Sequence, residues 1–159
     1  MAQPPPHVAG LTHPVQAGPL NFDWGSRTYV MGIVNITPDS FSGDGLLGAG
    51  TEGLVERALE QAQQFVEAGV DILDVGGEST RPGAQPVSGE EELARVLPVI
   101  RALRERFEGV ISVDTYRASV AEAALQSGVN MVNDVWGLRA DPDLAHVIAR
   151  HQVPVVLMH

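Results

Sequence analysis

The feature that most constrains the fold is a regular alternation between short apolar runs and longer segments with a helical pattern. The apolar runs are rich in Val and Ile and lack strict polar alternation, which is typical of strands covered on both faces. Five strands are expected at residues 28–36, 71–76, 109–114, 130–134 and 153–159, and four helices at 52–68, 88–103, 117–128 and 142–150. Strands that alternate with helices pair in parallel through right-handed crossovers. The sequence therefore predicts an α/β fold with a parallel sheet.

Two architectures fit this alternation: an open doubly wound sheet, and a (β/α)8 TIM-type barrel of which the chain covers about the first five strands. A barrel needs about 250 residues, and the chain has 159, so length favours the open sheet. The expected strand ends favour the barrel, because each carries polar residues. An open sheet concentrates its site at one switch point, whereas five polar strand ends indicate a circular site. Loop and helix-capping roles remain the alternative for any single residue.

Charge and composition limit the classes of partner. The formal net charge is −10, which argues against nucleic acid as a partner. No apolar stretch reaches the roughly 20 residues of a membrane span, so no membrane partner is expected. The chain has no Cys and therefore no disulfide or thiolate metal site. A cytoplasmic location is expected, and any anion would be bound locally.

The N-terminal 20 residues differ from the rest. They are rich in Pro and Gly and predict a flexible tail, which leaves one barrel domain at residues 21–159. Gly25-Ser26 is expected to form a hairpin turn between a short strand and a longer one.

Two expected strand ends carry groups suited to a flat heterocycle. Asp114 and Asn133 end neighbouring strands, and a carboxylate beside a carboxamide can bind the N–H edge of an amino-pyrimidinone. Gly76 and Gly77 allow the backbone to turn closely past a ligand. Arg81 is a candidate contact for phosphate oxygens.

The loop after the first expected strand is rich in oxygen donors. Mg²⁺ accepts such hard donors together with water and substrate phosphates. The candidates are Asn35, Thr37, Asp39, Ser40 and Asp44.

Several segments together resemble the dihydropteroate synthase family. They are MGIVNITPDSFS, DVGGESTRPGA, SVDT, NDVWG and VVLMH, in this order, and the resemblance covers residues 28–159. It implies a (β/α)8 barrel that joins p-aminobenzoate to a pterin pyrophosphate with the help of Mg²⁺. It also implies a sulfonamide target, and a homodimer for the full-length form.

The resemblance assigns roles by position. Asp114 and Asn133 would hold the pterin ring, and Val135 and Met158 would line its pocket. Asn35 would hold the metal–pyrophosphate group and would act in catalysis with Arg81 and Asp114. Two mobile loops would close over pyrophosphate and build the aminobenzoate site, with Phe41, Thr80, Arg81 and Pro82.

The chain departs from the family pattern in two respects. It reads DSFSGDG where the family reads DSFSDGG, so the Asp lies one residue later, at position 44. The family also places ligand-binding groups after strands six to eight, which lie beyond the five strands expected in this chain. We therefore expect a truncated form with two open sheet edges, prone to aggregation or dependent on a partner, and with weak or no catalysis by itself.

Two alternative functions stay open. A pterin-binding methyltransferase barrel would also place Asp and Asn at strand ends, but it would not need the Thr80–Arg81 loop. A non-catalytic pterin-binding fragment, or a subunit that completes a barrel with a second chain, is the other. A nucleotide-binding open sheet is disfavoured because no G-x-G-x-x-G follows the first strand.

Overall fold

Five parallel strands form the centre of the molecule. The computed structural model describes residues 14–37, 50–79 and 85–158. The sheet has the order β3-β4-β5-β6-β7, which is the order of the chain, with bounds β3 (Met31–Asn35), β4 (Ile72–Gly76), β5 (Val110–Asp114), β6 (Met131–Asp134) and β7 (Val155–Leu157). All five predicted strands are present, and consecutive strands are neighbours as they are in a barrel.

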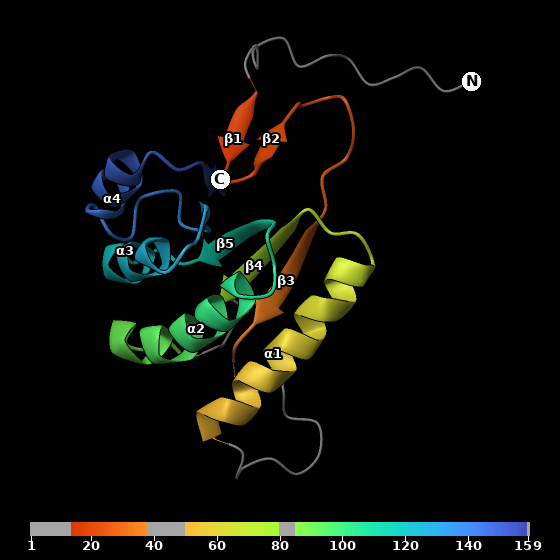
Figure 1. The fold of residues 1–159 in the computed structure, drawn as a ribbon. Helices are drawn as coiled ribbons and strands as arrows, with labels where there is room; N and C mark the ends of the chain where they lie inside the picture. The colour runs from red at the N-terminus through yellow and green to blue at the C-terminus, as the bar shows by residue number, and fades with distance from the viewer. Residues whose placement is uncertain (1–13, 38–49, 80–84, 159) are drawn as a thin grey trace.

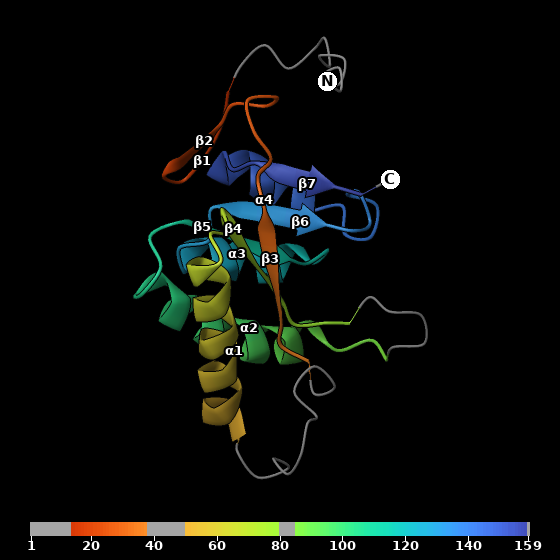
Figure 2. The ribbon, with the colours of Figure 1, turned by 90° about the vertical axis from the view of Figure 1, so that its right-hand side faces the viewer.

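Four helices pack on one face of this sheet. They are α1 (Gly50–Glu67), α2 (Gly89–Arg104), α3 (Ala118–Gln126) and α4 (Leu144–His151). Figure 2 shows β3 in front, with α2 and α3 behind the sheet. The main core lies between the two layers and contains Val34, Val75, Val113 and Val132 from the strands. A doubly wound sheet carries helices on both faces, so this arrangement favours the barrel.

Polar side chains hold the starts of α2 and α4. Ser88 caps α2, since its hydroxyl accepts a hydrogen bond from Glu91 N at 3.1 Å. Asp141 lies ahead of the fourth helix, where its carboxylate accepts a hydrogen bond from Asp143 N at 3.0 Å, and α4 itself begins at Leu144. The Asp141 carboxylate also accepts a hydrogen bond from Ala118 N at the start of α3, at 2.7 Å. Its carboxylate therefore joins two helices.

A short hairpin precedes the sheet and corrects the expected tail. Strands β1 (Val15–Ala17) and β2 (Leu20–Phe22) pair antiparallel (Figure 1), so residues 15 to 20 are not a tail. The hairpin turn lies at residues 18 and 19, earlier than expected, while Gly25-Ser26 forms a separate turn. Ala17 and Phe22 are fully buried against Ile72, Val110 and Met131. These three residues lie on the inner face of the sheet, which is the face turned away from the four helices. The hairpin thus covers the N-terminal end of the inner face.

The C-terminal end of the inner face is more open. Ile33 and Val156, which point away from the helices, are 53% and 43% exposed. Within the described residues, β3 and β7 are the edges of the sheet. No described helix has the length and apolar character needed to cross a membrane.

Candidate active site at the carboxyl ends of the strands

Three of the predicted site residues lie in one row across the sheet. Asn35 pairs with Gly76, Gly76 with Asp114, and Asp114 with Asn133. Side chains alternate along a strand, and Val34, Val113 and Val132 face the helices. Asn35, Asp114 and Asn133 therefore face the inner side, at the end where barrel enzymes place their active sites.

Gly76 gives this row its free space. A Cβ atom at Gly76 would lie 3.4 Å from Asn35 Oδ1 and 3.5 Å from Asp114 Cβ. A side chain there would fill the gap between the carboxamide and the carboxylate. The glycine therefore leaves both groups open to a common ligand.

Asp74 is a site residue that the sequence interpretation missed. It lies one inward-facing position before Gly76, is 2% exposed, and accepts a hydrogen bond from Asn133 Nδ2 at 3.0 Å. Its Oδ1 has no hydrogen-bond partner within the described residues. The signal in the sequence was an acidic residue inside the apolar run ILDVG, because an ionisable group is rarely buried in a strand without a role.

The two carboxyl groups of the site have raised pKa values. Burial raises the pKa of Asp74, and the hydrogen bond from the Asn133 amide opposes this effect. Burial, followed by the charge of Asp74 and then of other acidic groups, raises the pKa of Asp114 to about 7. Two acidic groups in one desolvated site disfavour double ionisation. A ligand that brings N–H donors would restore the charged form of Asp114.

The contact between Asn133 and Asp74 sets the polarity of the site. Because Asn133 Nδ2 donates to Asp74, the Asn133 Oδ1 is the atom that can accept from a ligand. Asp114 also offers acceptor oxygens when ionised. The inner surface is thus built to accept hydrogen bonds, which suits the donor-rich edge of an amino-substituted heterocycle.

Asp134 has a structural role instead. Its carboxylate accepts hydrogen bonds from Trp136 N at 2.8 Å and Leu138 N at 2.5 Å. It is fully buried and shapes the turn after β6, where Leu138 has a φ of 61°. For this residue the loop interpretation of a polar strand end is correct.

The remaining predicted residues divide into two groups. Val135 is half-buried and Met158 is 58% exposed, and they follow β6 and β7 beside Asn133. Four others lie outside the described residues, namely Phe41, Thr80, Arg81 and Pro82.

Two of the candidate oxygen donors, Asn35 and the buried Thr37, lie within the described residues, whereas Asp39, Ser40 and Asp44 lie outside them. Within those ranges no cluster of three His, Asp or Glu side chains could hold an ion. The Asn35 carboxamide oxygen lies at the rim, which is the edge formed by the carboxyl ends of the strands, and is nevertheless a hard donor. It fits Mg²⁺ that is bound mainly by substrate phosphates and water, since this ion needs few protein ligands.

Comparisons with known proteins agree with this architecture. Residues 31–159 match the family model of pterin binding enzymes, and the chain belongs to that family. Dihydropteroate synthase of Clostridium beijerinckii is 47% identical over 145 residues, which are 91% of this chain and 52% of the relative. The Synechocystis enzyme is 49% identical, over 92% of this chain and 49% of its own length. The chain therefore spans about half the length of these curated relatives.

Solved structures support the barrel interpretation of the sheet. Dihydropteroate synthase from Clostridium difficile, solved in the presence of pteroic acid, has a TM-score of 0.77 and 51% identity, over 84% of this chain and 49% of its own. The Xanthomonas albilineans enzyme with 4-aminobenzoic acid has a TM-score of 0.78 and 48% identity, over 88% of this chain and 48% of its own. The prediction of a TIM-type barrel, represented by about its first five strands, is confirmed.

Proposed function

We propose that the chain provides the pterin-binding half of a dihydropteroate synthase. The reaction would join p-aminobenzoate to 6-hydroxymethyl-7,8-dihydropterin pyrophosphate and release pyrophosphate. The observation that carries the proposal is the acceptor surface made by Asp74, Asp114 and Asn133 at the carboxyl ends of neighbouring strands. Relatives solved with pteroic acid and with 4-aminobenzoic acid support the choice of substrates.

The pterin ring would be held by its hydrogen-bond donors. Asp114 in its charged form would accept from the amino-pyrimidinone edge, and Asn133 Oδ1 would accept beside it. Asp74 would fix the Asn133 amide in the orientation that leaves this oxygen available. Positioning of this kind lowers the barrier because the reacting carbon is held ready for attack.

The transfer step would break the C–O bond between the pterin methylene and pyrophosphate. The bonding electrons leave on pyrophosphate, the amine nitrogen of p-aminobenzoate forms the new C–N bond, and the amine proton passes to solvent. Mg²⁺ bound to the pyrophosphate would offset the negative charge that builds there. Asn35 would help to hold that group. The proposed contacts to pyrophosphate and aminobenzoate include Phe41, Thr80, Arg81 and Pro82. The proposal also includes a homodimer for the full-length form.

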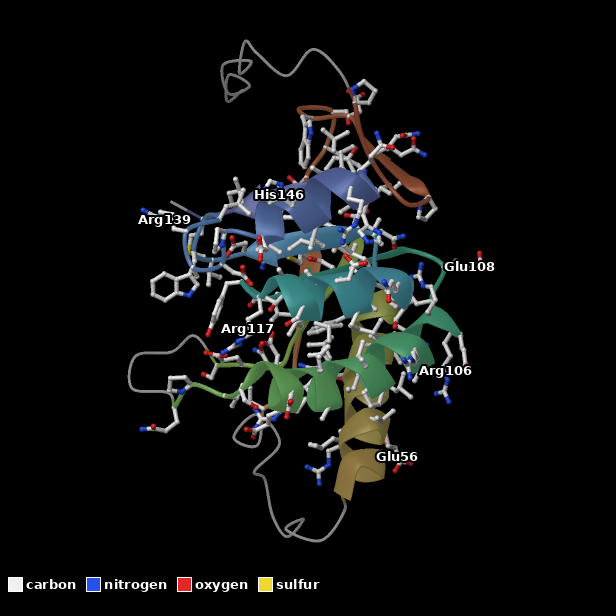
Figure 3. The ribbon with its side chains drawn as sticks, turned by 90° about the vertical axis from the view of Figure 1, so that its left-hand side faces the viewer. Glu56, Arg106, Glu108, Arg117, Arg139 and His146 are labelled. Carbon is white, nitrogen blue, oxygen red and sulfur yellow. The ribbon has the colours of Figure 1, made fainter. Side chains whose placement is uncertain are left out.

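Calorimetric titration with the pterin pyrophosphate and Mg²⁺ tests the proposal. We expect binding by the parent chain and at least a tenfold loss for Asp114→Ala. Glu108→Ala removes an exposed carboxylate before β5, at the opposite end of the strand from Asp114, and is the matched control (Figure 3). Equal affinity for parent and Asp114→Ala would refute the site. Binding that is unchanged when the pyrophosphate is absent would point to the methyltransferase alternative.

A further inference from the structure

One guanidinium group links three segments behind the rim. Arg117, just before α3, contacts the Glu78 carboxylate at 2.5 Å and also the Glu92 carboxylate through Nη1, while Nη2 donates to Val87 O at 2.6 Å. Glu78 follows β4, Val87 precedes α2, and Glu92 lies in the first turn of α2. Figure 3 shows Arg117 between α2 and α3. The two ends of the β4–α2 connection are therefore held by the same side chain.

The contacts are mostly shielded from water. Glu92 is 1% exposed, and the Arg117 and Glu78 side chains are 17% and 15% exposed. The Tyr116 ring lies under the guanidinium at 4.3 Å, and its hydroxyl donates to Glu78. A buried carboxylate needs a charged partner. A planar guanidinium can serve several acceptors at once, whereas a lysine ammonium at the same place cannot match this geometry.

These contacts lead directly to the candidate site. A Cβ atom at Gly77 would lie 3.0 Å from Glu92 Cγ, so the Gly77 backbone packs closely on this residue. Gly76 in turn lies between Asn35 and Asp114. After β5, Arg117 N donates a hydrogen bond to Thr115 Oγ1 at 3.2 Å, and Thr115 directly follows Asp114. Arg117 therefore contacts residues that support the site after β4 and after β5. It contacts none of the inward-facing residues Asp74, Asp114 and Asn133.

We propose that Arg117 is a positioning residue that fastens the ends of β4 and β5 together and so fixes the Gly76-Gly77 backbone against Asp114. The consequence for ligand affinity rests on the proposed pterin function. The consequence for backbone order does not, because it follows from the contacts alone.

The test compares Arg117→Lys with Arg150→Lys. Arg150 pairs with Glu122 between α4 and α3, is 63% exposed and lies away from the rim, so it controls for loss of an arginine ion pair. Hydrogen exchange is measured at the amides of Gly77, Glu78 and Val87, and pterin pyrophosphate affinity by calorimetry below the melting temperature. We expect exchange at these amides to rise at least tenfold, and affinity to fall about tenfold, only in Arg117→Lys.

Each outcome decides the proposal. A lower melting temperature with unchanged rim exchange and affinity would mean a purely stabilising ion pair and would overturn it. If the parent does not bind the pterin, the proposed function fails, while the exchange comparison still decides whether Arg117 orders the rim. If Arg117→Lys does not fold, Glu78→Gln replaces it, because Arg117 then keeps Glu92 as a partner and loses only the β4 end. Unchanged rim exchange in Glu78→Gln would also overturn the proposal.

Discussion

The two ends of the inner face of the sheet differ in chemistry. At the N-terminal end the β1–β2 hairpin buries an apolar cluster that includes Phe22, Val110 and Met131. At the C-terminal end the same strands carry Asp74 and Asp114, whose pKa values are raised by burial and, for Asp114, also by neighbouring acidic groups. One end of each strand thus contributes stability, while the other holds a ligand-ready arrangement that is unfavourable without a ligand.

The largest expected effect comes from the apolar end. Phe22→Ala removes a fully buried ring and should lower the free energy of unfolding by about 3–4 kcal/mol. Denaturant unfolding followed by fluorescence measures this. Pterin affinity below the melting temperature should stay within twofold, since the ring lies at the other end of the strands. A tenfold loss of affinity would show that the two ends are not independent.

The acidic end should respond in the opposite direction. The folded pKa of Asp114 lies above the unfolded value, so the folded state binds more protons and stability is lost as pH rises from about 4 to 7. Asp114→Asn should therefore stabilise the protein at pH 8 by about 1–3 kcal/mol, after allowance for partial exposure, and by much less at pH 4. Thermal unfolding at both pH values measures the difference. Glu108→Gln is the control and should change stability at neither pH.

Ligand binding should show the same titration. A group with a pKa of about 7 is about one-tenth ionised at pH 6 and about nine-tenths ionised at pH 8. Pterin affinity should therefore strengthen up to about tenfold over this range if the carboxylate is the binding form. Calorimetry at three pH values, with a pterin analogue that does not titrate there, checks this. A flat profile would mean that the ligand binds the protonated acid equally well.

The smallest expected effect comes from Asp71, just before β4 at the apolar end. The Arg27 guanidinium holds the pKa of this carboxyl below its usual value, with hydrogen bonds of 2.6 and 3.0 Å. Its contribution is present above the unfolded pKa of 3.8 and is lost as pH falls through the lower folded value. Arg27→Gln should move the midpoint of acid unfolding slightly to higher pH. It should not change the difference in stability between pH 6 and pH 8. Acid unfolding curves measure it, and an unchanged midpoint would contradict the pairing.

Long periodic elements could be predicted from the sequence, whereas features set by tertiary contact could not. The five parallel strands and four helices were found within about three residues, because each repeats its apolar pattern over several positions. Strands β1 and β2 have three residues each, too few for any period to show, and only burial against Ile72 and Met131 makes them strands. Asp74 was missed because its role depends on Asn133, 59 residues later.

The candidate site follows the same division. That Asn35, Asp114 and Asn133 lie in one row could be predicted because strand ends in a parallel sheet meet at one edge. The Arg117 cluster could not, since Glu78, Glu92 and Arg117 meet only through the packing of α2 and α3 on the sheet. Residues whose function depends on such packing leave no local pattern in the sequence.

The hairpin also carries a consequence for how the chain folds. Phe22 is buried partly by Met131, about 110 positions later in the sequence. During synthesis at about 5–20 residues per second, the ring would wait roughly 5–20 seconds before its last partner emerges from the ribosome. Because non-local contacts form slowly, the early hairpin is a natural site for chaperone contact while translation continues, and it should be among the last parts of the molecule to become protected.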